Sequence, residues 1–77
     1  MNDVPPTASE YWDDICLMVA DGDGKWVLIA EDQERARNEL VRERLGLRGL
    51  SVDVVSRKGN PERGRDWSGW RTWARVL

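Results

Sequence analysis

The shortage of crosslinking residues is the strongest constraint on what this chain can fold into. Cys16 is its only cysteine and it has no histidine, so one chain can assemble neither a disulfide framework nor a Cys/His zinc site. A domain of 77 residues buries only roughly 60% of its unfolded surface, which leaves a marginal hydrophobic core. Oligomerisation is the remaining common supplement to such a core, and we therefore look for an interface.

The apolar run from Ile15 to Ala20 contains the cysteine and is the longest unbroken apolar stretch of the chain. A cysteine in such a run is typical of a small buried side chain, and a free thiol suits a reducing cytoplasm. A membrane-spanning helix needs roughly 18 to 20 apolar residues, far more than this run offers. Residues 1–10 lack the basic and apolar regions of a secretory signal. We expect a cytoplasmic protein that makes no membrane contact and has a disordered lead-in at residues 1–10.

Residues 11–77 are predicted to form a single domain that opens with a β-hairpin. Residues 12–20 and 25–30 are rich in Val, Ile, Leu and Trp, and they flank the sequence Asp-Gly-Asp-Gly at 21–24. Two apolar runs around such a turn signal are typical of antiparallel strands. The same four residues could begin a calcium loop, but a lysine and an aspartate stand where an EF-hand needs its third oxygen ligand and its glutamate. We therefore favour the turn.

One helix is predicted between Asp32, which can cap its N-terminus, and Gly46 or Gly49, which can end it. Apolar residues recur along it at spacings of four and seven: Ala36, Leu40 and Leu47. Charged residues lie between them and are expected to form an ordinary solvent-exposed face.

Two further strands are predicted at residues 50–56 and 69–77. The polar residues 57–66 contain two glycines and a proline, and they indicate a mobile basic loop between these strands. The element order β-β-α-β-β indicates a small α+β domain with a four-stranded, mostly antiparallel sheet and one helix packed on one face.

The first two predicted strands are apolar on both of their sides, which leaves one face of the sheet in need of a cover. A helix of about 14 residues is roughly 21 Å long and covers a single face. The second face, with Met18, Trp26 and Leu28, must then meet another part of the chain, a second subunit or a partner. The alternative is a seal formed by aromatic side chains of the same chain: Tyr11, Trp12 and Trp67.

Residues 57–77 are basic and rich in tryptophan. They hold six of the twelve basic side chains, three of the five tryptophans and only two acids, so their net charge is +4 whereas residues 1–56 carry −6. Alternation along the last strand places Trp70 on one face and Arg71, Trp73 and Arg75 on the other. The simplest interpretation is that Trp70 belongs to the core and that Trp73 lies between the two arginine stems.

Two functional interpretations use this basic segment. Trp and Arg are the residues most enriched at protein-binding hot spots, which favours a protein interface. In the nucleic-acid interpretation, Trp67 or Trp73 stacks on an unpaired base while basic side chains contact phosphates. The candidate phosphate contacts are Arg57, Lys58, Arg63, Arg65, Arg71 and Arg75. A sequence pI near 5.0 speaks against nucleic acid, because dedicated nucleic-acid domains have a pI above roughly 9.

Catalysis is the class that the residues support least, because the commonest general base, histidine, is absent and no nucleophile motif is present. We predict a non-catalytic protein-binding module, without cofactor, metal or small-molecule substrate, that associates with itself as a homodimer or with another protein. The predicted contacts are Met18, Trp26, Leu28, Arg57, Lys58, Arg63, Arg65, Trp67, Trp70, Arg71, Trp73 and Arg75. The alternative prediction is a nucleic-acid-associating module that uses residues 57–75.

Overall fold

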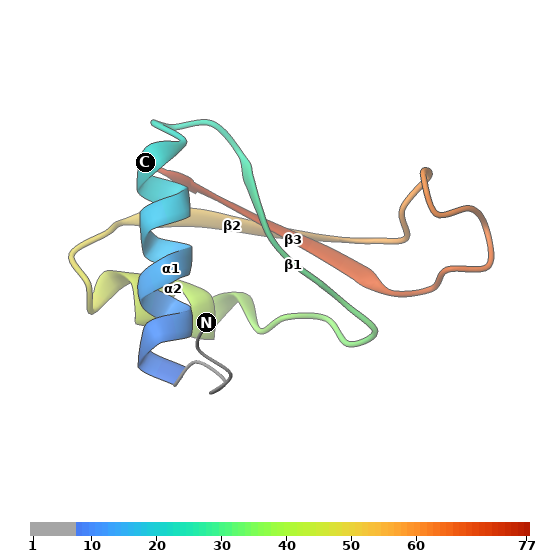
Figure 1. Ribbon diagram of the computed structural model, residues 1–77, viewed down its shortest axis with the longest axis horizontal. Helices are drawn as coiled ribbons and strands as arrows, with labels where there is room; N and C mark the ends of the chain where they lie inside the picture. Colours follow the sequence, from blue (N-terminus) through green and yellow to red (C-terminus); the bar gives the residue numbers. More distant parts are fainter. Residues whose placement is uncertain (1–7) are drawn as a thin grey trace, which may run out of the picture.

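A three-stranded antiparallel sheet with two helices on one side forms the domain (Figure 1). The computed structural model describes residues 8–77. Its elements are α1 (Ala8–Asp21), β1 (Val27–Asp32), α2 (Asn38–Gly46), β2 (Val52–Lys58) and β3 (Trp70–Val76). The predicted α+β class is confirmed. The predicted four strands with one helix are wrong, because the described residues contain three strands and two helices in the order α-β-α-β-β.

The first apolar run forms α1 and not a strand, and its buried residues recur with the period of a helix. Trp12, Ile15 and Val19 are spaced by three and four residues, so they lie on one side of a helix, and Ile15 and Val19 are buried. A strand would place Leu17 on the same side as these two residues, yet Leu17 is 69% exposed. The predicted hairpin at residues 12–30 is therefore wrong.

The Asp-Gly-Asp-Gly sequence does turn the chain, but it turns it from α1 into β1. The backbone N–H of Gly22 donates to the carbonyl of Met18 (3.2 Å), which closes the end of the helix. Asp23 and Gly24 then have positive φ angles of 51° and 89°, the left-handed region that glycine adopts at little cost. A side chain at Gly22 would meet Val27, since a Cβ there would lie 2.5 Å from its Cγ2 atom. This close approach holds the start of β1 against α1.

The second helix is shorter than predicted, because β1 continues through Asp32, the residue that was expected to cap it. α2 instead begins at Asn38 and ends at Gly46, one of the two predicted end points. Its buried residues are Val41 and Leu45. Leu47 was predicted to belong to the apolar stripe, but it follows the last turn and is 73% exposed.

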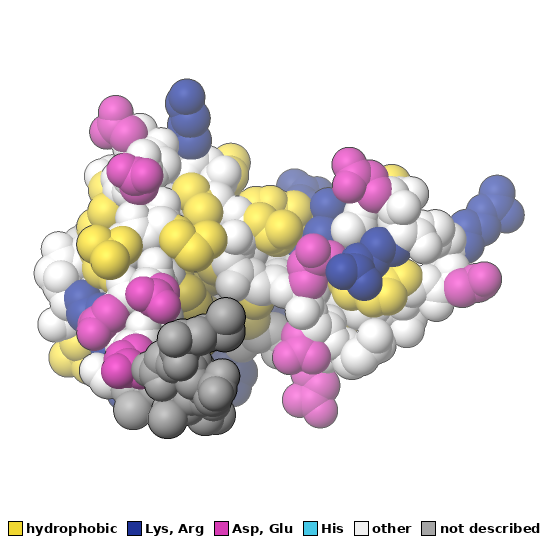
Figure 2. Space-filling view, viewed as in Figure 1, with side chains coloured by type: hydrophobic (Ala, Val, Ile, Leu, Met, Phe, Trp, Pro, Cys, Tyr) yellow, Lys and Arg dark blue, Asp and Glu magenta, His cyan; other side chains and the backbone are white. Residues whose placement is uncertain are grey.

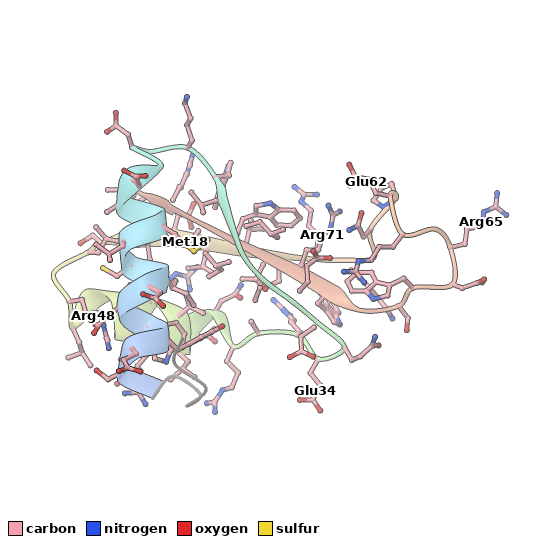
Figure 3. All side chains as sticks on the ribbon, viewed as in Figure 1. Met18, Glu34, Arg48, Glu62, Arg65 and Arg71 are labelled. Carbon is pink, nitrogen blue, oxygen red and sulfur yellow. The ribbon has the colours of Figure 1, made fainter. Side chains whose placement is uncertain are left out.

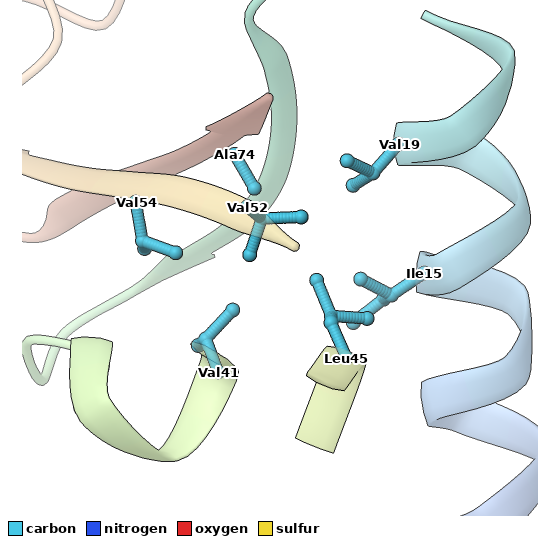
Figure 4. Packing of buried hydrophobic residues seen from close by; sticks show 7 residues of the cluster. All are labelled: Ile15, Val19, Val41, Leu45, Val52, Val54 and Ala74. Atoms are coloured by element: carbon cyan, nitrogen blue, oxygen red, sulfur yellow. The ribbon is translucent and has the colours of Figure 1, made fainter. Parts of the chain in front are cut away.

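β3 lies in the middle of the sheet, between β1 and β2, and pairs antiparallel with both (Figure 1). Both helices pack on the same face: α1 contacts β1 and β3, and α2 contacts β2. Figure 4 shows the buried cluster between these layers, which consists of Ile15, Val19, Val41, Leu45, Val52, Val54 and Ala74. The opposite face of the sheet carries no helix of the described chain.

The ends of the predicted loop and lead-in also differ from the structure. Residues 1–7 of the predicted lead-in lie outside the described residues, and residues 8–10 belong to α1. Arg57 and Lys58 belong to β2, so the connection to β3 runs from 59 to 69. The backbone N–H of Gly59 donates to the carbonyl of Gly69 (2.8 Å), which closes the base of this connection.

Candidate functional site

Strand pairing arranges the uncovered side of the sheet in rows. Thr72 and Ala74 of β3 are buried on the side of the helices, so Arg71, Trp73 and Arg75 point to the other side. We call this side the open face. Its side chains are Leu28 and Glu31 of β1, Arg71, Trp73 and Arg75 of β3, and Asp53, Val55 and Arg57 of β2, with Trp26 at its margin just before β1.

The middle row of the open face is apolar across all three strands. Leu28 pairs with Trp73 on one side and Val55 pairs with Trp73 on the other. Leu28 is 40% exposed and the neighbouring Trp26 is 42% exposed. Val55, Trp73 and Trp26 line a shallow hollow of about 380 Å³. Trp73 and Val55 are half-buried, so the apolar row crosses the whole sheet and exposes most of its surface at Leu28 and Trp26.

An arginine of β3 lies on each side of this apolar row. The guanidinium of Arg71 lies over Trp73, 4.7 Å from the ring centroid, and its Nε donates to the carbonyl of Gly59 (2.9 Å). The guanidinium of Arg75 lies 4.6 Å from the centroid of Trp26, and its Nη2 is 3.7 Å from Oδ2 of Asp53. Cation–π contacts of this kind hold long side chains in defined positions. Both arginines are therefore fixed along the surface of the sheet.

Stacking of arginine on tryptophan recurs outside the open face as well. Arg35 lies over Trp70 (5.5 Å) and Arg63 lies over Trp67 (5.1 Å). The predicted position of Trp73 between the stems of two arginines is correct for Arg71, whereas Arg75 stacks on Trp26 instead.

Six of the predicted contact residues are brought together on the open face: Trp26, Leu28, Arg57, Arg71, Trp73 and Arg75. Met18 is not among them. It lies on α1 (Figure 3), 49% exposed, and not on a strand of the sheet. Its predicted position beside Leu28 depended on a strand at residues 12–20. These residues belong to α1, so Met18 is not part of the sheet.

The remaining predicted residues surround the connection between β2 and β3. Arg57, Lys58, Arg65 and Arg71 contribute to the wall of a hollow of about 730 Å³, together with Trp67 and Trp70. We call this the loop hollow. No acidic residue lines it. Arg63 lies outside and forms an ion pair with Glu31 of β1 (Nε to Oε2, 3.2 Å), while Arg65 extends from the tip of the connection (Figure 3).

Val55 is the open-face residue that sequence reasoning missed. Its signal was present in the order Val-Asp-Val-Val at 52–55, because Asp53 marks the solvent side of the strand and Val55 shares its parity. The charged partners Glu31 and Asp53 were also missed. Their positions follow from the pairing of β1 and β2 with β3, which no local pattern of the sequence reveals.

Within residues 8–77, no group of three or more Cys, Asp or Glu side chains is placed to hold a metal ion. Neither helix of this part of the chain is long and apolar enough to cross a membrane. Comparisons with protein-family models, with curated proteins and with solved structures find no match. The functional argument therefore depends on the chemistry of the open face and the loop hollow.

Proposed function

We propose that this chain is a non-catalytic protein-binding module whose open face takes a helical segment that carries apolar side chains between carboxylates. The observation that carries the proposal is the apolar row Leu28, Trp73 and Val55, which crosses the sheet between Arg71 and Arg75 on the face that neither helix covers. Soluble proteins seldom leave such a strip unpaired unless it binds something.

The dimensions of the open face suit one helix. Three strands are spaced by about 4.8 Å, and the longer two have seven residues that each rise about 3.4 Å, so the surface measures at most roughly 14 Å by 24 Å. A helix with its side chains is roughly 10 to 12 Å wide, so one helix fills this area. A standard interface between two folded proteins buries about 800 Å² on each partner, which is more than this face provides.

The charges of the open face favour carboxylates on the partner. The side chain of Arg57 takes part in no ion pair or hydrogen bond within residues 8–77, and Arg57 lies opposite Arg71 on the neighbouring strand. A guanidinium can bind a carboxylate through two parallel hydrogen bonds. The face therefore offers an apolar centre for burial and arginines at its margin for orientation.

A pair of synthetic peptides tests this proposal. One is a helical peptide with a stripe of leucines flanked by glutamates, and the other has lysines in place of the glutamates. We expect the acidic peptide alone to change the tryptophan fluorescence of the protein. Leu28→Glu should abolish the change, whereas Leu47→Glu, the same substitution at an exposed leucine of the α2 end, should not. Equal binding of both peptides, or binding that survives Leu28→Glu, would contradict the proposal.

A second candidate function, association with single-stranded nucleic acid, is favoured by one observation: the loop hollow combines four cations and two tryptophans with no acid in its wall. If each cation neutralised one phosphate, log affinity would fall with log salt at a slope of about −3. A labelled oligonucleotide should then bind about 50-fold more weakly at 200 mM than at 50 mM salt.

The matched variants for the second candidate are Arg65→Ala and Lys25→Ala. Arg65 belongs to the loop hollow, whereas Lys25 precedes β1 and is exposed elsewhere. Loss of oligonucleotide affinity only in Arg65→Ala supports this function. Affinity that does not depend on salt, or that both variants reduce equally, rejects it.

A further inference from the structure

We infer that the helical segment bound by the open face is α1 of a second copy of this chain, so that copies associate head to tail. This inference rests on the proposed protein-binding function of the open face, and it names the partner.

The outer side of α1 has the composition that the open face requires. The inner side of the helix carries Ile15 and Val19 against the sheet. The opposite side is formed by Leu17, with Asp14 and Asp21 three residues before it and four residues after it. Met18, three residues after Ile15, lies on the flank of the helix between the two sides. Leu17 and Met18 are among the most exposed large apolar side chains of residues 8–77. α1 thus carries one exposed apolar residue on its outer side, Leu17, which lies between acids, and a second, Met18, on its flank.

Charge favours contact between these two surfaces. α1 contains four acidic residues, Glu10, Asp13, Asp14 and Asp21, and no basic residue. Asp13 is paired with Arg48 of the same chain, so the attraction rests on Asp14 and Asp21, which lie on either side of Leu17. Figure 2 shows acidic side chains along α1 with hydrophobic ones between them. The open face presents three arginines against two acids, and one of these acids, Asp53, is shared between Arg75 and Arg42. An acidic helix and a basic sheet face therefore attract one another.

The lengths of the two surfaces also match. α1 has 14 residues and is therefore about 21 Å long, while β2 and β3 have seven residues each and extend about 24 Å. On the covered face, α1 already packs against β1 and β3 of its own sheet. A second α1 on the open face would give the sheet a helix layer on both sides, which is the usual way to bury a sheet with two apolar faces.

A copy of the chain cannot make this contact with itself. The outer side of α1 faces away from the sheet, and the open face points away from both helices, so the two surfaces lie on opposite sides of the domain. Contact between copies is therefore heterologous, and it leaves one free α1 and one free open face at the ends of every assembly. Pairing of two open faces would instead bring Arg57, Arg71 and Arg75 of both copies together, which like-charge repulsion disfavours.

The small contact area predicts weak association. A surface of roughly 14 Å by 24 Å is below the size of a stable interface. We therefore expect monomers at roughly 1 µM and growing assemblies at roughly 100 µM and above. Raised salt should shorten the assemblies, because part of the attraction is between exposed charges.

Complementation between two blocked variants tests the head-to-tail contact. Leu28→Glu blocks the open face and leaves α1 intact, whereas Leu17→Arg blocks the outer side of α1 and leaves the open face intact. Both positions are exposed, so circular dichroism should show folded protein in each case. Light scattering on a sizing column should find wild type growing with concentration, and each variant alone as a monomer. An equimolar mixture should form a heterodimer that grows no further, since only one intact pair of surfaces remains.

Each other outcome overturns the inference in a different way. A wild-type monomer at roughly 500 µM rejects self-association, and the acidic peptide then decides separately whether the open face binds a helix at all. A mixture of the two variants that stays monomeric rejects the pairing of α1 with the open face. Continued growth of Leu28→Glu alone places the contact elsewhere. The variant Leu47→Glu should behave as wild type, and loss of its assembly would show a non-specific effect of added charge.

Discussion

Leu45 and Leu47 provide a matched pair of leucines, two residues apart, that tests the packing of α2. Leu45 is completely buried between the helices and the sheet, whereas Leu47 is 73% exposed. Replacement of a buried leucine by alanine removes apolar contacts and leaves a cavity, at a cost of about 3 kcal/mol. A domain of this length is stabilised by about 4 to 12 kcal/mol in total. We expect Leu45→Ala to remove a large part of this stability and Leu47→Ala to cost less than about 0.5 kcal/mol.

Urea denaturation followed by circular dichroism measures this difference. With a slope of about 1 kcal/mol per molar urea for a small domain, the midpoint should fall by about 3 M in Leu45→Ala. In a thermal scan the midpoint should fall by about 12 to 24 °C. Leu47 stands at the C-cap, just after the last turn of α2, so its substitution is the control for the loss of an exposed leucine, and the difference between the two variants reports mainly the burial of Leu45. Equal shifts in the two variants would refute the position of α2 against the sheet.

Two further predictions concern the joints between elements. Gly22→Ala should destabilise the domain by about 1 to 3 kcal/mol, because the new Cβ would press on Val27. Gly46→Ala should not destabilise it, because the space around the new Cβ is open. Thermal unfolding of the two variants measures the difference. Arg48→Ala removes an ion pair from the segment after α2 to α1, between its Nε and Oδ1 of Asp13 (2.6 Å), together with hydrogen bonds to the carbonyls of Arg44 and Ser9. It should cost about 1 to 3 kcal/mol, because the arginine side chain is only 21% exposed. At 1 M salt this cost should shrink, and an undiminished cost would show that the arginine acts through packing.

The three strands could be predicted from sequence to within two residues, and the first helix could not. β1, β2 and β3 have β-branched and aromatic residues with solvent-facing charges in alternation, a pattern that a strand explains. The run at 12–20 is short and almost wholly apolar, so period two and period 3.6 fit it about equally. Only the acids distinguish a helix from a strand here, since Asp14 and Asp21 are seven residues apart and share the outer side of a helix.

We expected one side of the sheet to be bare, but the reason for this expectation was partly wrong. A single helix was expected to leave one side of the sheet bare, yet two helices are present and both pack on the same side. Trp26 and Leu28 lie on or beside the bare side, and Met18 does not. The position of Val55 beside Trp73 depends on the pairing of β2 with β3. Such pairing is a tertiary property, which local residue patterns do not contain.

The strand order has a consequence for how the nascent chain folds. β1 and β2 do not pair with each other, and each pairs only with β3. The end of β1 and the start of β3 are separated by 37 residues. At a synthesis rate of about 5 to 20 residues per second, β1 is without a ladder partner for about 2 to 7 s. During this interval β1 has no strand partner, and its apolar side chains are not yet covered by a completed sheet. The whole sheet then closes in one late event, when its middle strand arrives.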